Sequence, residues 1–406
     1  MTSGTTIGAA IGATIVATIG DNQDMETEHF IGLISGTSMD GIDAVLVDFS
    51  GSRPAPIGGQ TFQYATDLRA ALDELRRDPD AFPAARLARL DTEVGQAFAE
   101  AAEGLLSEAG AEPRSVRAIG SHGQTVLHRP DDAFAHTLQI GDATRIAAHT
   151  GIDVVADLRR ADLAAGGQGA PLAPLIHQAL LADPSESRVV INLGGIANVT
   201  LLPAGGGVSG FDTGPANCFI DDWYRAHHPD QGQDGKTPRF DAGGRWAASG
   251  SVDKTWLAEL MQEPYLQRKP PKSTGIEYFS PAWLRQRLPN DAQERPADIQ
   301  ATLAEFSAKS LVENIERFVP FRPDRILLCG GGVANTHLVE RIRARLGDIP
   351  IESTADHGID PDFVEATLIA WLAREHIAGR AINTPTITGA RHPIRLGALW
   401  PAPPVL

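Results

Sequence analysis

Three turns rich in small residues carry the pattern of a phosphate-binding site. The first, GTSMDG, spans residues 36–41 and lies between two apolar runs. The second is Gly194-Gly195 and the third is Gly330-Gly331-Gly332, each directly after an apolar run. Backbone N–H groups in such tight turns converge on an anion without needing a lysine. Together the three turns predict a site for phosphate groups.

An aspartate within the first turn indicates that the anion arrives with a metal ion. Magnesium accompanies ATP and prefers carboxylates and water as ligands, so Asp40 is predicted to hold it directly or through water. Thr37 and Ser38 would add hydroxyl donors to the phosphate oxygens. The alternative is that Asp40-Gly41 forms only a hairpin turn, where Asp-Gly is favoured sterically. For the repeated set of turns, the phosphate interpretation is the better one.

Other nucleotide motifs are incomplete. Gly235-Lys236-Thr237 matches the end of a P-loop, but Asp230 occupies the position of the first glycine. Gly167-Gln168-Gly169 begins a dinucleotide fingerprint, which Leu172 breaks. We therefore predict that ATP is bound by the three turns, through Gly36, Thr37, Ser38, Asp40, Gly41, Gly194, Gly195, Gly330, Gly331 and Gly332.

The composition is that of an acidic globular protein. The chain has 406 residues and a formal charge of −16, with no Lys/Arg cluster, which argues against nucleic acid or an anionic membrane as a partner. Cys218 and Cys329 are too few for a disulfide framework and suit small buried positions in a reducing cytoplasm. Residues 1–28 have an apolar run without a preceding positive charge, and we expect a flexible extension.

Apolar runs alternate with helical patterns, which predicts an α/β protein with mixed sheets. We expect strands at 31–34, 42–49, 116–120, 152–156, 189–193, 199–202 and 325–329. We expect helices at 83–109 and 296–318, and a third that begins with Asp360 as N-cap and Pro361 and runs to about Ile377. Strand–turn–strand at 31–49 resembles that at 189–202, which predicts two similar halves with a cleft between them.

The Gly- and Pro-rich stretch at 166–175 marks the expected crossing between the halves. The predicted N-terminal lobe spans 29–165 and is joined by the C-terminal segment 385–406. The predicted C-terminal lobe spans 166–384. Closure of the two lobes over substrate would exclude bulk water, which competes for the phosphoryl group.

The ordered set of motifs resembles anhydro-N-acetylmuramic acid kinases, of the sugar kinase–actin–heat-shock ATPase superfamily. The resemblance covers residues 29–401 and is carried by SGTSMDGIDAVLVDF, IGSHGQTVLHRP, LQIGD, GIDVVADLRRADLAAGGQGAPLAP, INLGGIANVTLL, GFDTGPANCFIDDW, PKSTG and LLCGGGVANTHL. It implies a two-lobed ATPase fold of duplicated ribonuclease-H-like domains with a central cleft. It further implies a homodimeric enzyme of peptidoglycan recycling, which uses magnesium ATP. The implied reaction opens the 1,6-anhydro ring of 1,6-anhydro-N-acetylmuramic acid with water and phosphorylates O6, giving N-acetylmuramic acid 6-phosphate and ADP.

The resemblance also assigns roles to four side chains. Asp212, in GFDTGPAN, matches the general base, which takes a proton from the water that attacks C1 of the sugar. From this residue alone, an Asx turn before a helix is the commoner explanation. Thr125, Arg160 and Glu365 match substrate-binding residues, with Arg160 expected to meet the lactyl carboxylate or to hold a reacting group. Thr125 could instead be a helix or turn cap, and Glu365 a first-turn charge that the helix dipole stabilises. Its neighbour Arg159 is the obvious source of confusion, and either arginine could be a solvated surface charge.

Three further residues have simpler explanations. His122 and His128 lack a third ligand at zinc spacing, so we expect polar packing there and no zinc site. Asn335 could cap the helix after the third turn instead of binding ligand.

Two other functions are compatible with the same fold. In a phosphohydrolase, water attacks phosphate, and ATP would be consumed without sugar as fast as with it. A non-enzymatic sugar sensor commonly carries an N-terminal DNA-binding domain, for which residues 1–28 are too short and too uncharged.

Overall fold

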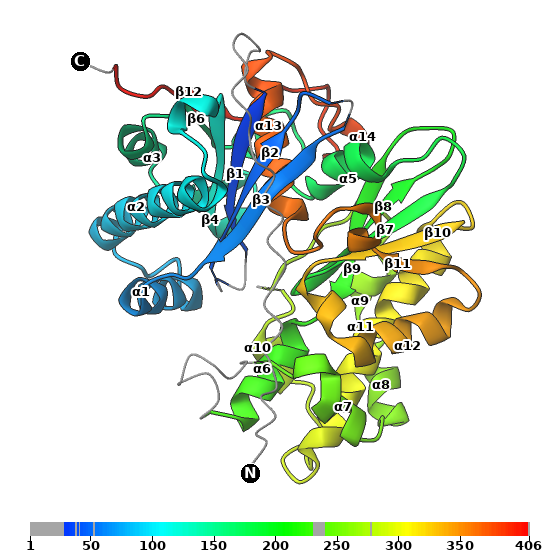
Figure 1. The fold of residues 1–406 in the computed structure, drawn as a ribbon. Coiled ribbons are helices and arrows are strands. Elements are labelled where there is room, and N and C mark those ends of the chain that lie inside the picture. The colour runs from blue at the N-terminus through cyan, green and yellow to red at the C-terminus, as the bar shows by residue number, and fades with distance from the viewer. Residues whose placement is uncertain are drawn as a thin grey trace, which may run out of the picture.

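Two β-sheets organise the chain, one in each of two lobes (Figure 1). The computed structural model describes residues 28–36, 39, 41–51, 53–229, 240–276 and 278–404. The first sheet has the strand order β12-β6-β4-β1-β2-β3, with β5 paired to β4. Its strands are β1 (His29–Ser35), β2 (Ile42–Asp48), β3 (Ala55–Phe62), β4 (Ala118–Arg129), β5 (His136–Ile140), β6 (Val154–Ala156) and β12 (Ala398–Trp400).

The second sheet has the order β11-β10-β7-β8-β9. Its strands are β7 (Arg188–Leu193), β8 (Ile196–Leu202), β9 (Ser209–Pro215), β10 (Arg325–Cys329) and β11 (Ile351–Ser353). In each sheet an antiparallel three-strand meander is extended by two parallel strands, β4 and β6 beside β1, and β10 and β11 beside β7. This repetition confirms the predicted fold, a two-lobed α/β protein made of duplicated halves.

Helices cover both faces of the central strands, which explains why β1 and β7 are buried along almost their whole length. The α-helices are α1 (Thr66–Arg77), α2 (Ala84–Ala109), α3 (Ala143–Thr150), α4 (Arg160–Ala164), α5 (Ala173–Leu181), α6 (Cys218–His227), α7 (Arg245–Ser249), α8 (Lys254–Leu260), α9 (Pro264–Gln267), α10 (Pro281–Arg285), α11 (Pro296–Phe318), α12 (Thr336–Leu346), α13 (Val364–Ile377) and α14 (Pro385–Thr388). Short 3₁₀ turns are η1 (Pro113–Ser115), η2 (Ala242–Gly244), η3 (Gly331–Ala334) and η4 (Thr354–His357).

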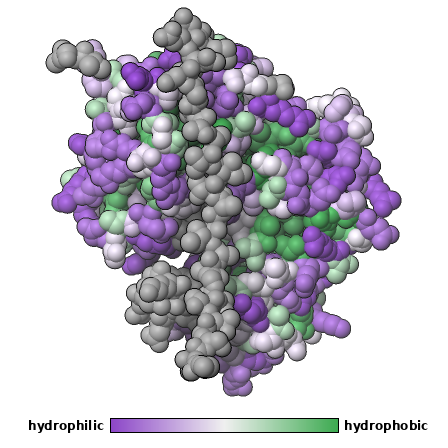
Figure 2. Space-filling model, viewed as in Figure 1, coloured by the Kyte–Doolittle hydropathy of each residue, from purple (hydrophilic) through white to green (hydrophobic). Residues whose placement is uncertain are grey.

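Helices α5 and α13 lie between the sheets and join the two lobes. One apolar cluster contains Phe30 and Val45 of the first sheet, Val190 and Leu327 of the second, and Ile369 of α13. Hydrophilic residues cover much of both lobes on the face shown in Figure 2. No helix in the described part of the chain combines the length and apolar composition that a bilayer span requires.

Most expected elements are present, and one helix start was wrong. Helix α11 has the predicted bounds, and α2 begins one residue later than expected. Helix α13 begins at Val364 rather than at Pro361. The Asp360 carboxylate accepts the Asp362 N–H (3.0 Å), and the Pro361 carbonyl accepts the Gly330 N–H (3.2 Å). Because the Pro361 carbonyl is bonded to the third glycine turn, the Asp-Pro pair forms a turn ahead of the helix.

The structure also returns the C-terminus to the first sheet, where β12 pairs with β6. The boundaries at 29–165, 166–384 and 385–406 remain a prediction. Cys218 and Cys329 are buried free thiols, and burial raises the pKa of each, as expected of small core residues.

Two paired glycines allow α13 to approach the first sheet, and replacing one should be strongly destabilising. Gly32 of β1 lies opposite Gly120 of β4. A Cβ atom on Gly32 would lie 1.8 Å from the Ala366 carbonyl oxygen in α13. We expect Gly32→Ala to lower the free energy of unfolding by about 2–3 kcal/mol, measured by urea denaturation. The control is Gly58→Ala on β3, where the nearest atom would be 4.0 Å away; equal stability of the two variants would contradict this packing.

Candidate active site

Asp212 is a buried carboxylate in strand β9, opposite Asn198 of β8. Its Oδ2 accepts the Thr274 N–H (2.9 Å), which comes from a loop 62 positions later. Its own N–H donates to the Lys272 carbonyl (3.1 Å), and its carbonyl accepts the Tyr265 hydroxyl (2.9 Å). The carboxylate is therefore oriented by the tertiary structure, through a hydrogen bond from a distant loop.

Arg159 is an arginine on which the charge of this carboxylate acts. Burial lowers the pKa of its guanidinium, while the nearby carboxylates of Glu365, Asp162 and Asp212 act in the opposite direction. Its Nη1 donates to the Gly169 carbonyl (2.6 Å) in the loop between the sheets. The guanidinium is thus fixed among three acidic groups that come from different segments of the chain.

Arg160, the arginine chosen from the sequence, lies in a different environment, and its role as a substrate-binding residue stays a prediction. Its side chain is 57% exposed, and its Nη1 lies 3.5 Å from the Asp157 carboxylate, in a surface ion pair. Arg159 precedes helix α4, whereas Arg160 is the first helical residue, so the two side chains leave the backbone in different directions. The charges of Asp212 and Glu365 act on the Arg159 guanidinium, whereas the ion pair of Arg160 is with Asp157.

His122 holds Arg159 in place without adding charge. Burial lowers the pKa of His122 to about 3, so its ring is neutral at pH 7. Its Nε2 accepts the Arg159 Nε–H (2.8 Å), and the remaining ring proton on Nδ1 is then donated to the Gly123 carbonyl (3.1 Å). Burial also lowers the pKa of His128, to about 4, and its Nδ1 lies 3.1 Å from the Thr137 hydroxyl. Polar packing of both histidines was expected from the sequence, whereas the hydrogen bond from Arg159 to His122 was not.

Glu365, in the first turn of α13, is accessible to solvent and yet densely surrounded by protein. Desolvation raises its pKa, Arg159 opposes this shift, and the like charge of Asp43 adds to it. Its Oε1 accepts the Asn192 amide (3.3 Å) at the end of β7. Glu365 thus connects α13 to the second sheet. Its side chain lies where both solvent and surrounding protein groups contact it, as the side chain of a ligand-binding residue would.

Gly36 follows the end of β1, beside strand β4, which carries Thr125. Ser35 donates to Gln124 Oε1 (2.7 Å), and Gln124 Nε2 donates to the Gly36 carbonyl (3.3 Å). Thr125 lies within β4, not after a strand end, and its hydroxyl accepts from Gln139 (3.2 Å). A strand extending to Arg129 was not expected, because glycine and histidine interrupt the apolar run after residue 120.

The first turn includes three predicted ATP-binding residues with polar side chains. Thr37, Ser38 and Asp40 lie outside the described residues. At Gly41 a Cβ atom would lie 2.7 Å from the Phe62 carbonyl oxygen, so packing against β3 requires glycine there. The described residues contain no group of three or more His, Cys, Asp or Glu side chains arranged to hold a metal.

The second turn is held by Asn217. The Asn217 side chain donates to the carbonyls of Leu193 (3.0 Å) and Gly194 (2.8 Å), and its backbone N–H donates to Gly194 (3.1 Å). The N–H groups of Ala216 and Cys218 donate to Gly195. The Gly194-Gly195 turn is therefore fixed by the start of α6, directly after the strand that carries Asp212. Asn217 was not recognised from the sequence.

The third turn packs against the second. Gly330 has φ +81°, and a Cβ atom there would lie 2.2 Å from Asn192 Oδ1. A Cβ atom on Gly332 would lie 2.6 Å from Asn217 Nδ2. Gly331, by contrast, is exposed and has no atom within 4 Å of such a Cβ. Asn335 caps α12 by accepting the Leu338 N–H (3.1 Å), which confirms the capping alternative.

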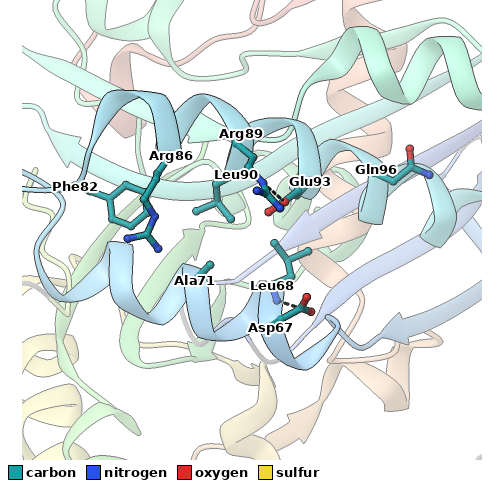
Figure 3. Close-up of a pocket in the computed structure, with 9 residues that line it drawn as sticks. All are labelled: Asp67, Leu68, Ala71, Phe82, Arg86, Arg89, Leu90, Glu93 and Gln96. Carbon is teal, nitrogen blue, oxygen red and sulfur yellow. Dashed lines mark hydrogen bonds and ion pairs between the residues drawn. The ribbon is translucent and has the colours of Figure 1, made fainter.

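A surface groove between α1 and α2 is separate from this arrangement (Figure 3). Its volume is about 480 Å³, and all its lining residues belong to 67–96. Its two arginines are ion-paired, Arg86 with Glu74 and Arg89 with Glu93. The groove contains none of the residues around Asp212, so we place the candidate active site where Asp212, Arg159, Glu365 and the second and third turns meet.

Known proteins match almost the whole chain. A family model for anhydro-N-acetylmuramic acid kinase matches residues 28–402. The anhydro-N-acetylmuramic acid kinase of Xanthomonas campestris pv. campestris (strain 8004) is 50% identical over 376 residues, which cover 92% of this chain and 97% of the relative. That of Shewanella amazonensis is 45% identical over 379 residues, which cover 93% and 100%.

Similarity to solved structures is lower. An activator of 2-hydroxyisocaproyl-CoA dehydratase from Clostridium difficile, with bound ADPNP, has a TM-score of 0.43 at 12% identity, covering 86% of this chain and 96% of that chain. The fold assignment therefore depends on the two sheets themselves. The family model and the relatives are decisive for the family: this chain belongs to the anhydro-N-acetylmuramic acid kinases.

Proposed function

We propose that this kinase opens the anhydro ring of 1,6-anhydro-N-acetylmuramic acid with water and phosphorylates O6 with ATP. The products would be N-acetylmuramic acid 6-phosphate and ADP. Membership of the family supports a kinase that acts on this sugar in cell-wall recycling. The observation that carries the hydrolytic step is Asp212, a buried carboxylate that Thr274 orients and that shares its surroundings with Arg159.

Asp212 would act as the general base. It takes a proton from the water that attacks C1, and the C1–O6 bond breaks with its electron pair remaining on O6. The O6 oxygen then attacks the γ-phosphorus of ATP, and ADP leaves. A carboxylate is suited to this role because it is ordinarily ionised at neutral pH and can hydrogen-bond to water.

The other polar groups would bind and orient the sugar. The guanidinium of Arg159 would attract the lactyl carboxylate, since a planar guanidinium matches a carboxylate in geometry and charge. Glu365 and Thr125 would accept or donate hydrogen bonds to sugar hydroxyl groups. His122 would fix the orientation of Arg159, because its neutral ring accepts the Nε proton.

Magnesium is compatible with the acidic residues near the first turn. Burial raises the pKa of Glu365, and the like charge of Asp43 adds to this shift; a divalent cation near the two carboxylates would relieve their repulsion. Asp40, the ligand predicted from the sequence, would complete the set. When bound with ATP, magnesium supplies positive charge that neutralises phosphate oxygens. A homodimer, which the family resemblance implies, and a cytoplasmic location, which suits two free cysteines, are part of the proposal.

Isotope labelling tests the hydrolytic step. Purified protein is mixed with magnesium ATP and 1,6-anhydro-N-acetylmuramic acid in ¹⁸O-water, and ADP and sugar phosphate are followed by mass spectrometry. We expect one ¹⁸O at C1 and one ADP for each sugar phosphate. ADP with free phosphate and no sugar phosphate would support the phosphohydrolase alternative and overturn the proposal.

Gly331 offers a test of the nucleotide site that does not alter packing. Alanine at this position has open space around it, so Gly331→Ala should leave the melting temperature unchanged. If the third turn approaches the nucleotide, the added methyl group should raise the KM for ATP by about tenfold, as an overpacked contact of 1–2 kcal/mol would. The control, Gly332→Ala, should lower the melting temperature because its methyl group meets Asn217 and Leu193. An unchanged KM for ATP in Gly331→Ala would remove this residue from the nucleotide site.

A further inference from the structure

We propose that Lys272 is a positioning residue for Asp212, which it holds by anchoring the loop 272–274. The inference rests on the proposed function, because it takes Asp212 as the general base. Lys272 would touch neither sugar nor nucleotide in this role. It would act through the backbone atoms that hold the Asp212 carboxylate and main chain.

The ammonium group of Lys272 is buried in a cage of aromatic and polar groups. The residue is 1% exposed, although lysine is almost never fully buried unless it is paired. Its Nζ donates to Asn314 Oδ1 (2.6 Å) and to the Tyr265 carbonyl (3.3 Å). It also lies 4.7, 5.2 and 5.9 Å from the ring centres of Tyr265, Phe318 and Phe211, within the range of cation–π attraction. This cage fixes the end of the side chain and thereby the loop that carries it.

The same loop and the same tyrosine hold Asp212 at three atoms. The Lys272 carbonyl accepts the Asp212 N–H, the Thr274 N–H donates to Asp212 Oδ2, and the Tyr265 hydroxyl donates to the Asp212 carbonyl. Between them, Ser273 donates to Gln168 Oε1 (2.9 Å), in the loop that carries the Arg159 partner Gly169. Anchoring of Lys272 therefore supports the position of Asp212 and of the loop that contains Gln168 and Gly169.

The positive charge of Lys272 is a second way in which this residue would support Asp212 as a base. Burial lowers the pKa of Lys272 to about 8, as does the charge of Arg268, while Asp212 opposes this shift and Arg317 adds to it. Lys272 is therefore mostly protonated at pH 7, and its charge stabilises the ionised form of Asp212. Arg159 and Tyr265 also interact electrostatically with Asp212. Removing the Lys272 charge leaves those groups in place and should raise the pKa of the base.

The test compares three variants by the pH profile of kcat. Lys272→Met removes the charge but keeps most of the length, and Lys272→Arg keeps the charge. The matched control is Lys309→Met, on the outside of α11, where the lysine pairs with Glu313. For Lys272→Met we expect kcat at pH 7 to fall at least tenfold and the acid limb to move up by about half a unit or more. The acid limb should stay in place in Lys272→Arg, and Lys309→Met should match the wild type.

A purely structural role would lower stability without moving the acid limb, and that result would overturn the proposal. Amide hydrogen exchange, followed by mass spectrometry without substrate, provides a readout independent of activity. In Lys272→Met we expect faster exchange in the peptides that contain Asp212 and Thr274, and unchanged exchange in α2. Unchanged exchange in the Asp212 and Thr274 peptides would also overturn the proposal. Should Lys272→Met not fold, Asn314→Ala removes one anchor but keeps the charge, and it is judged by hydrogen exchange alone. Absence of sugar phosphorylation in the wild type would instead overturn the proposed function, and the exchange measurement would still decide the role of Lys272.

Discussion

Replacing Asp212 with asparagine should lower kcat by about 10²- to 10⁴-fold, the usual contribution of a general base. Asparagine has nearly the same shape, and its side-chain oxygen can still accept the Thr274 N–H that now bonds to Oδ2. It cannot take a proton from water. Formation of ADP and sugar phosphate should therefore fall together, while the KM for ATP stays close to the wild-type value.

The control for this variant is Asp80→Asn, an exposed carboxylate paired with Arg129 near the end of α1. Exposed ion pairs contribute about 1 kcal/mol or less, so this change should leave both kcat and the melting temperature almost unaltered. A folded Asp212→Asn protein that made sugar phosphate at near wild-type rate would contradict the assignment. The base would then have to be sought among the other acidic groups of the site, with Glu365 first.

The strands and long helices were predictable because local signals and tertiary structure agree. Strand β7 is a continuous apolar run that both sheet faces bury, and α11 keeps helical spacing from its first-turn proline to its last turn. The repeated strand–turn–strand pattern predicted the duplication for the same reason. Helix α13 was less predictable, because the bond from Gly330 to the Pro361 carbonyl is a tertiary contact without a local signature.

A glycine in the sequence can be required by packing within the protein or by the approach of a ligand, and the sequence alone does not distinguish these two reasons. Gly330 and Gly332 are required by packing against Asn192 and Asn217, whereas Gly331 has no such neighbour. Sequence analysis assigned all three to the nucleotide. The polar groups that hold the site were missed for a related reason. Thr274 is 62 residues from Asp212 in the chain, and no spacing rule connects them.

The adjacent arginines provide the other prediction with a large expected effect. Replacing Arg159 with methionine should lower kcat/KM for the sugar by about 10²- to 10³-fold, because losing one partner of a buried charge interaction costs about 2–5 kcal/mol. Arg159 is fixed by His122 and Gly169 and interacts with the carboxylates of Asp212 and Glu365. Arg160→Met is the matched control and should change kcat/KM less than about threefold, since its ion pair is exposed.

A second sugar separates two possible roles of Arg159. 1,6-Anhydro-N-acetylglucosamine lacks the lactyl carboxylate but keeps the anhydro ring. If Arg159 binds that carboxylate, the wild type should lose activity on this analogue, and Arg159→Met should then differ little from the wild type. An equal loss on both sugars in Arg159→Met would instead mean that Arg159 acts at the reacting centre, through Asp212 or Glu365. A larger loss in Arg160→Met than in Arg159→Met would contradict the geometry, because a side chain directed to solvent would then be the one that binds substrate.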